Sequence, residues 1–379
     1  MKTTNRFAIL LATLVSISSG DRAWSDTFGS GANMFNIEFV EIGNPDNPAD
    51  TTGNPAPNPA GSVPYLYRIG RFEISEQMID KANALGGLGI TKDTRGPNKP
   101  ATRVSWNEAA RFVNWLNTST GSARAYKFAL QPGEVGYIAN ADIQLWDTGD
   151  AGYNPNNLYR NSLARYFLPS AHEWYKAAYY DPSANGGTGG YWNFPTGSDN
   201  APTPVASGTA AGTAVFDRPF SSAPADITLA GGLSPYGTMG QGGNVWEWEE
   251  TAFDLMNDSG SSARGQRGGG WANINLLLSS SMRYTGGSPN GSISNGSFRV
   301  ASSPSAVGLP GDFNRDGKVD AADYVVWRKT DGTPGGYTEW RTNFGQPAGG
   351  GGTCSSVPEP ATWLSLLVAA SSIGVLRRK

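Results

Sequence analysis

Two stretches of the chain repeat apolar residues with the period of an α-helix. The spacings are three and four positions, so each helix is expected to pack one stripe against a core: Ala109, Phe112, Val113 and Leu116 in the first, and Trp174, Ala177 and Ala178 in the second. Each stretch opens with Ser-x-x-Glu, at Ser105 and at Ser170. In that pattern the serine side chain caps the helix and the glutamate reaches back to the serine amide.

The other apolar segments are short and typical of β-strands. They cover residues 35–42, 65–74, 166–168, 245–249, 269–272 and 297–301. The stretches at 44–62, 181–200 and 201–212 are too rich in Gly, Pro, Asn and Thr to hold regular structure. We predict two or three helices against small twisted sheets. Ordered loops of such length usually serve a function or are tied by a metal.

The composition agrees with this low content of regular structure. The 379 residues include 50 glycines, 25 prolines and 12 tryptophans, which describes a loop-rich domain held by large aromatic side chains. The formal net charge is −3 and no cluster of Lys and Arg occurs, so nucleic acid is not expected as a partner. Cys354 is the single cysteine and His172 the single histidine, which excludes an intrachain disulfide and any metal site built from several of either.

The first 25 residues have the features of a secretory signal peptide. A basic start is followed by an apolar run over 7–17 and by the small residues Ala23 and Ser25. Cleavage is expected before Asp26, with cleavage after Gly20 as the alternative. An uncleaved anchor fits less well, because the apolar run is too short to span a bilayer. The chain is therefore expected to be exported.

Residues 357–379 have the features of a second targeting segment. Val-Pro-Glu-Pro is followed by an apolar run over 361–376 and by Arg-Arg-Lys; as a helix the run would rise about 24 Å, marginal for a ~30 Å hydrocarbon core. This order resembles the PEP-CTERM sorting signal. The resemblance implies an exosortase-type enzyme as a partner, membrane contact through the tail, and a location in the cell envelope or outside the cell. A simple tail anchor is the alternative, and the glycine-rich residues 347–356 are expected to be a flexible linker.

Five segments of the main domain carry a family resemblance. They are TRVSWNEAARFVNWLN at 102–117, YFLPSAHEWYKAAYY at 166–180, GGNVWEWEE at 242–250, RGGGW at 267–271 and SFRVAS at 297–302. Their order and spacing resemble the formylglycine-generating enzyme, or sulfatase-modifying factor, family over residues 33–302. The resemblance implies an α+β fold, a variant of the C-type lectin-like fold with little regular structure. Arg267, Trp271 and Arg299 would then be structural.

The family's known oxidation reaction does not fit this sequence. The resemblance implies two copper-binding cysteines between the RGGGW and SFRVAS blocks, and soft monovalent copper needs thiolate ligands. That region has Ser279, Ser280 and Ser281 but no cysteine, and Cys354 lies in the predicted linker. Branches of the family that use iron need several histidines. His172, in the first turn of its helix, is expected to be a surface or capping residue.

The family resemblance also implies calcium in the main domain. The ligands would be loop carbonyls and an acid of the GGNVWEWEE block, with a further ligand in a second site: Gly243, Val245 and Glu247, and Asn193. Gly240 stands where the family often has a side-chain oxygen. In the alternative interpretation Glu247 pairs with an arginine such as Arg299.

Residues 312–323 have the spacing of a calcium-binding loop. Oxygen ligands are available at loop positions one, three, five, seven, nine and twelve: Asp312, Asn314, Asp316, the Lys318 carbonyl, Asp320 and Asp323. Gly317 at position six permits the sharp turn. The alternative is a solvated Asp/Gly-rich loop.

The helix after this loop makes residues 308–346 resemble a dockerin-type segment, which implies a cohesin-like protein as partner. The pattern Tyr-x-x-Trp-Arg-x-x-x-Gly occurs at 324–332 and again at 337–345. The second copy lacks the acidic loop, so one calcium ion is expected. Both aromatic pairs are expected to pack helix on helix, because so short a segment needs the metal to fold.

Together these features predict an exported cell-envelope protein with a non-catalytic, lectin-like domain that binds glycan or protein, followed by a calcium-dependent docking module. Tyr191 and Trp192 in the loop 181–200, and the loop 288–297, are the candidate contact surface; the alternative is ordered loops without a ligand. A second hypothesis is an enzyme with a cysteine-independent activity. Its acid and base candidates are Glu247, Glu249 and Asp254.

Overall fold

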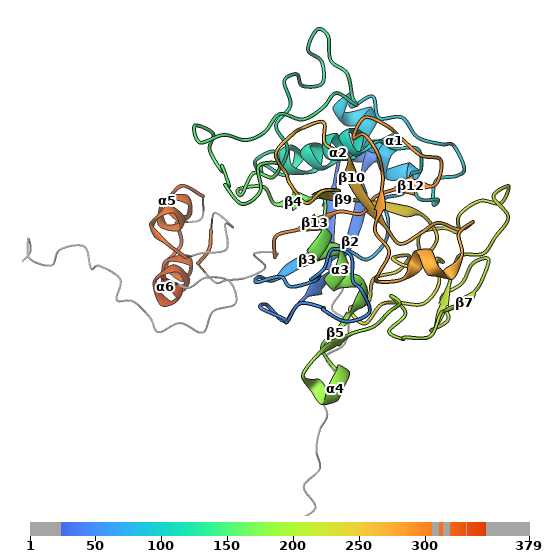
Figure 1. Ribbon diagram of the computed structural model, residues 1–379. Coiled ribbons are helices and arrows are strands. Elements are labelled where there is room, and N and C mark those ends of the chain that lie inside the picture. Colours follow the sequence, from blue (N-terminus) through green and yellow to red (C-terminus); the bar gives the residue numbers. More distant parts are fainter. Residues whose placement is uncertain (1–23, 305–310, 314–318, 331, 346–379) are drawn as a thin grey trace, which may run out of the picture.

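A five-stranded antiparallel sheet joins the two ends of the main domain. The computed structural model describes residues 24–304, 311–313, 319–330 and 332–345. The sheet has the order β1-β2-β3-β13-β4, made of Trp24–Phe28, Phe35–Ile42, Tyr67–Gly70, Ala301–Ser302 and Tyr166–Phe167. Strand β13 lies between β3 and β4, so the last segment of the domain closes a sheet that the first segments begin (Figure 1). The sheet starts at Trp24, before the domain start at 33 that the sequence indicated.

A second sheet carries the polar core of the domain. Its order is β11-β10-β9-β12, made of Tyr284–Thr285, Arg264–Arg267, Trp246–Ala252 and Gly296–Ser297. Strand β12 runs parallel to β9, and the other pairs are antiparallel. Two smaller sheets pair β5 with β6 and β7 with β8: Tyr180–Asp181 with Gly190–Tyr191, and Thr203–Pro204 with Thr213–Ala214.

Both predicted helices form, and both begin with a complete capping box. They are α2, Trp106–Ser119, and α3, Ala171–Tyr179. The Ser105 hydroxyl accepts from the Glu108 amide at 3.2 Å, and the Ser105 amide donates to the Glu108 carboxylate at 2.9 Å. Ser170 and Glu173 repeat this pair of bonds. The main domain also contains one long helix that the sequence analysis did not predict, together with short turns: α1, Glu76–Gly86; α4, Ala184–Gly187; η1, Gly31–Asn33; and η2, Asn275–Leu278.

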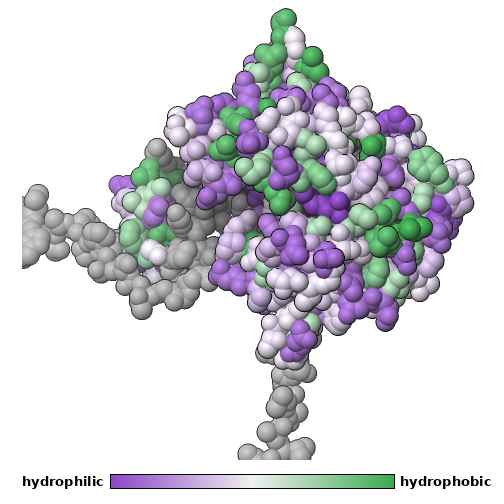
Figure 2. Space-filling model, viewed as in Figure 1, coloured by the Kyte–Doolittle hydropathy of each residue, from purple (hydrophilic) through white to green (hydrophobic). Residues whose placement is uncertain are grey.

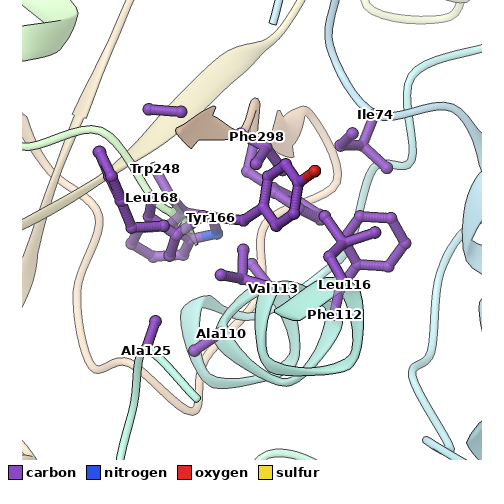
Figure 3. Close-up of a cluster of buried hydrophobic side chains, with 14 of the residues drawn as sticks. Ile74, Ala110, Phe112, Val113, Leu116, Ala125, Tyr166, Leu168, Trp248 and Phe298 are labelled. Carbon is purple, nitrogen blue, oxygen red and sulfur yellow. The ribbon is translucent and has the colours of Figure 1, made fainter. Parts of the chain in front are cut away.

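The predicted stripe of α2 lies at the centre of the main hydrophobic core (Figure 3). Phe112, Val113 and Leu116 are fully buried, as are Trp248 and Phe298 from the second sheet and the segment that follows it. Full burial of each large apolar side chain contributes on the order of 1.5–3 kcal/mol. The result is a mixed α/β domain with little regular structure, which confirms the predicted fold class.

The C-terminal helices α5, Ala321–Thr330, and α6, Pro334–Asn343, pack through aromatic rings, as predicted. The ring centroids of Tyr324 and Trp340 are 5.0 Å apart, and those of Trp327 and Tyr337 are 5.4 Å apart. The Gly345 amide donates to the Val319 carbonyl at 2.7 Å, which joins the end of the pair to its start.

The predicted targeting segments fall almost entirely outside the described residues. Residues 1–23 of the expected signal peptide, the linker at 347–356 and the tail at 357–379 are not described. Helices long and apolar enough to cross a membrane do not occur in the described ranges.

Candidate functional site

Strand β9 places three glutamates in the interior of the domain. Glu247, Glu249 and Glu250 have exposed fractions of 0%. Side chains alternate along a strand, so Glu247 and Glu249 share one face and Glu250 lies on the other. Removing a carboxylate from water costs several kcal/mol unless it is paired and hydrogen-bonded. Each of the three is paired with arginine from another segment.

Arg299 forms a bidentate ion pair with Glu247. Its Nη2 and Nε lie 2.5 and 2.6 Å from the two carboxylate oxygens, and Trp174 Nε1 donates to Oε2 at 2.8 Å. The Arg299 guanidinium also donates to backbone carbonyls of Gly70 and Met239. The protein itself therefore supplies donors to both oxygens of Glu247. This is the arrangement that the alternative interpretation described, and it favours the ion pair over a calcium ligand for this side chain.

The other predicted calcium ligands of the main domain lie on two different segments. Gly243 has a positive φ of 88° at the turn before β9, and its amide donates to the Gly268 carbonyl at 2.7 Å. Val245 is fully buried two residues further on. Asn193 is exposed, and its carbonyl accepts from the Ser280 amide at 2.9 Å. Groups of three or more Asp, Glu, His or Cys side chains that could hold a metal ion do not occur among the described residues.

Glu249 is held between two arginines. Arg267 Nε lies 2.6 Å from Oε1 and Arg283 Nε lies 2.7 Å from Oε2. Burial alone would raise the pKa of Glu249, but the charges and hydrogen bonds of the two arginines outweigh it and lower the pKa below its ordinary value. Glu249 is therefore ionised at neutral pH and is a poor proton donor.

The three serines of the region where the family resemblance implied thiols, Ser279, Ser280 and Ser281, lie near this ion pair. Arg267 Nη1 donates to the carbonyl of Met282 at 3.1 Å and approaches that of Ser280 at 3.5 Å. Ser279 and Ser280 are 8% and 2% exposed. The Ser279 hydroxyl donates to the Leu276 carbonyl at 2.7 Å. A serine whose proton is given to a backbone carbonyl has no base positioned to activate it.

His172 is half-buried and accepts a backbone hydrogen bond from a loop far away in the sequence, so it is neither a surface residue nor a cap of its own helix, whose N-cap is Ser170. The amide of Gly61 donates to Nδ1 at 3.1 Å. Burial lowers the pKa of the imidazole below its ordinary value. The neutral ring with Nδ1 as the acceptor is therefore the form present at neutral pH.

The third buried glutamate belongs to a network that the sequence analysis missed. Arg160 Nη2 lies 2.7 Å from Glu250 and 2.8 Å from Glu173, the glutamate of the second capping box. The hydroxyl of Tyr126 donates to Glu250 at 2.9 Å. Arg160 precedes α3 in a loop, and no local pattern in the sequence marks it as a partner of β9.

The two predicted ligand-contact residues are bonded to their own domain. Tyr191 is half-buried, and its hydroxyl accepts from Asn47 at 2.6 Å and donates to the Pro48 carbonyl at 2.9 Å. Trp192 Nε1 donates to Asp181 at 3.1 Å. The remaining acid candidate, Asp254, is exposed in the loop after β9 and accepts from the Met256 amide at 3.0 Å.

Parts of the predicted calcium loop near α5 are described. Asp312 is 8% exposed and Asp323 is fully buried. The Asp320 amide donates to Asp323 Oδ2 at 2.8 Å, and Trp340 Nε1 donates to the Asp320 carbonyl at 2.7 Å. The three other predicted ligands lie outside the described residues: Asn314, Asp316 and Lys318.

Glu73 is a buried carboxyl that the sequence analysis did not single out. It is 1% exposed, and its Oε1 accepts from Asn244 at 2.8 Å. Its Oε2 has no hydrogen-bond partner in the described part of the molecule. Burial raises the pKa of Glu73 to about 7, although the charge of Arg299 opposes the shift. A Cβ at Gly240 would lie 2.5 Å from Glu73 Oε1, so Glu73 fills the space that a side chain at 240 would need.

We predict that Arg299→Met lowers the free energy of unfolding by about 3–5 kcal/mol, because Glu247 is left buried and unpaired. Urea denaturation measures the change. The control is Arg103→Met, which breaks an ion pair to Asp93 at 3.0 Å whose arginine side chain is 57% exposed; its expected cost is about 0–1 kcal/mol. Similar decreases of the free energy of unfolding in the two variants would contradict a main stabilising role for Arg299.

We predict that Glu73→Gln removes a pH dependence of stability. A carboxyl whose pKa is raised from 4.5 to about 7 by folding stabilises the native state below pH 4.5 and loses that contribution as the pH rises to 7. The loss is on the order of 3 kcal/mol. Thermal unfolding at pH 5 and pH 8 should show the variant gaining stability relative to the wild type only at pH 8. The exposed control Glu41→Gln should show no such gain, and a destabilised Glu73→Gln variant at pH 8 would refute the prediction.

Comparison with known proteins places the domain in a family. The model of the sulfatase-modifying factor enzyme 1-like domain, FGE-sulfatase, matches residues 58–304. None of the curated proteins matches the chain. Among solved structures, Treponema denticola variable protein 1 is 18% identical, with 74% of this chain and 99% of that chain covered and a TM-score of 0.48.

Two further solved structures resemble the chain at similar levels. CarF is 20% identical, with 70% of this chain and 98% of that chain covered and a TM-score of 0.44. PvdO from Pseudomonas aeruginosa is 17% identical, with 73% and 98% covered and a TM-score of 0.41. The family match spans well over half of the chain, and the chain therefore belongs to the FGE-sulfatase family through its sulfatase-modifying factor enzyme 1-like domain.

Proposed function

We propose that the main domain is a non-catalytic binding domain, displayed outside the cell, that recognises glycan or protein. The observation that supports this proposal is that the polar side chains of β9 and of the segment 279–281 are bonded to other groups of the domain. Glu247 and Glu249 are fully buried and form ion pairs with arginines. The hydroxyl of Ser279 donates its hydrogen bond to a backbone carbonyl. These groups stabilise the fold and offer neither a nucleophile nor a free base.

The alternative function, an enzyme with a cysteine-independent activity, is favoured by one observation. A pKa of about 7 suits Glu73 to proton transfer at neutral pH. A general acid or base must also come within hydrogen-bond reach of a substrate. With 1% exposure, Glu73 gives a substrate no direct access, so the binding domain remains the preferred proposal.

Export and display are part of the same proposal. The signal-peptide features of residues 1–25 and the sorting-signal resemblance of 357–379 support a location in the cell envelope or outside the cell. An exosortase-type enzyme would process the tail. The linker at 347–356 would separate the folded modules from the membrane.

We further propose that residues 308–346 form a calcium-dependent docking module for a cohesin-like protein. Asp312 and Asp323 are the first and last ligands of the predicted loop, and both are buried. The aromatic packing of α5 on α6 supplies a small core, and the oxygen-rich spacing of residues 312–323 is that of a loop that binds Ca²⁺. The ion would contribute folding energy to this short segment.

The purified full-length chain is expected to leave a sulfatase-derived cysteine peptide unchanged in mass when copper and oxygen are supplied. The physical reason is the missing pair of thiolates, without which monovalent copper has no suitable ligands. Mass spectrometry of the peptide measures the result, with an active formylglycine-generating enzyme as the positive control. Conversion of the cysteine to formylglycine by this chain would refute the proposal that the domain is non-catalytic.

Calorimetric titration of the full-length chain with Ca²⁺ is expected to show a site that Asp312→Ala or Asp316→Ala removes, because each substitution deletes a loop ligand. The control Asp254→Ala changes an exposed acid outside the loop and should leave binding unchanged. A calcium site that survives both loop substitutions would belong to the main domain. Absence of any site sensitive to Asp312 would refute the docking-module proposal.

A further inference from the structure

A cavity of about 200 Å³ is lined by residues of α2, Trp106–Ser119, and of the segments around it. Its lining includes the apolar side chains of Trp115, Leu88 and Pro132 and the polar side chains of Arg111, Arg124 and Gln131. A water molecule takes up ~30 Å³ in the liquid, so the volume equals that of roughly six or seven waters. The cavity, called here the Trp115 pocket, can accept one small ring and not an extended ligand.

The shape of the Trp115 pocket depends on a glycine. The indole of Trp115 stacks on Phe35 with ring centroids 5.9 Å apart. A Cβ at Gly86, the last residue of α1, would lie 2.6 Å from Trp115 Cδ1. Any side chain at this position would displace the indole. Stacking on Phe35 and the absence of a side chain at Gly86 together keep the Trp115 ring in the lining of the cavity.

The charge of the Trp115 pocket is positive. Arg111 lies over the ring of Phe128, 3.6 Å from its centroid, and donates to the carbonyl of Leu130 at 2.6 Å. Burial lowers the pKa of Arg111 to about 10, so it remains charged at neutral pH. Its other two nitrogens donate to the carbonyls of Ala139 and Ile138, and the charge of Glu134 acts to raise its pKa.

Arg124 is the second cation of the Trp115 pocket. Its side chain is exposed and makes no hydrogen bond or ion pair with any other described residue. The described residues that line the cavity include no Asp or Glu. Arg111 is buried and bonded to carbonyls, so Arg124 is the cation of this pocket that can reach a ligand. A free guanidinium favours an anionic group and can bind a carboxylate or a sulfate through two parallel hydrogen bonds.

A small ligand fits these observations better than a protein surface does. Figure 2 shows groups of apolar residues among hydrophilic ones over the face in view. The lining of the Trp115 pocket itself is mixed in polarity, whereas protein-binding sites often present a larger continuous apolar patch. Binding sites for small molecules combine apolar and aromatic walls with a few placed polar groups. A pyranose ring has an apolar C–H face for the indole and hydroxyls for the amide of Gln131.

We propose that the Trp115 pocket binds one acidic pyranose unit, a uronate or a sulfated sugar residue of a polysaccharide. The sugar ring lies against Trp115, and the anionic group is held by Arg124. This inference rests on the proposed binding function of the main domain and names the class of its ligand.

The test is calorimetric titration of the full-length chain with four probes: methyl β-D-glucuronide, glucose 6-sulfate, methyl β-D-glucoside and benzoate. The two acidic sugars are expected to bind at least tenfold more tightly than the neutral glucoside. Preference for glucuronide or for the sulfate identifies the anionic group. Benzoate that binds as tightly as the acidic sugars would overturn the assignment of a sugar.

Arg124→Gln is expected to weaken binding of the acidic sugars at least tenfold and to leave binding of the glucoside unchanged. Its thermal unfolding should match the wild type, because the side chain is exposed and unpaired among the described residues. Arg218→Gln is the matched control, since Arg218 does not line the cavity. Equal weakening in both variants, or none in Arg124→Gln, would refute the pocket assignment.

A glycan array with the same two variants separates this inference from the proposed function. Binding of acidic glycans that Arg124→Gln abolishes supports both. Binding of glycans that Arg124→Gln leaves intact supports a glycan-binding domain and refutes the Trp115 pocket as the site. An array without any bound glycan refutes the pocket and the glycan part of the proposed function together.

Discussion

Burial of the three β9 glutamates is the constraint on which the rest of the domain depends. Each carboxylate would cost several kcal/mol in the interior without a partner, and the partners come from segments far apart in the chain. Arg299 follows β12, Arg267 ends β10, and Arg160 lies in the loop before β4. The ion pairs form only when these segments are in place. A chain with short strands and long loops thereby obtains a single arrangement of its core, because a misplaced loop leaves a buried charge unpaired.

The sequence was most informative where the interactions are local. The α2 stripe and both capping boxes involve residues three or four positions apart, and all form as predicted. Helix α1 was missed because its local signals are weak. Its cap Ser75 is followed at the third position by Met78 instead of Glu, and it buries only Ile79 and Ala82 of its apolar residues. Its capping and apolar patterns are too weak to distinguish the helix from the loops around it in the sequence.

The polar core could be predicted only in part. Glu247 and Arg299 lie in segments that resemble the family, so their pairing was foreseen as one of two interpretations. Arg160 and Glu73 belong to no such segment. Their contacts join residues 90 and 171 positions apart, and sequence spacing carries no information on pairs that only the folded topology brings together. Buried charge outside a recognised motif is therefore the part of this site that required the structure.

Helix α2 contributes both to the main core and to the proposed pocket. Its inner face supplies Phe112 and Val113 to the core that covers β9, and substitutions there act on the whole domain. Trp115 packs on Phe35 and Phe112 at the edge of that core and also lines the pocket, together with Arg124 from the loop beyond the helix. Neither residue contacts the ion pairs of β9. A substitution at Arg124 therefore leaves every buried carboxylate with its partner, whereas a substitution at Arg267 or Arg299 does not. The proposed ligand site can vary at this exposed residue while the arginine-paired core that holds the fold stays intact.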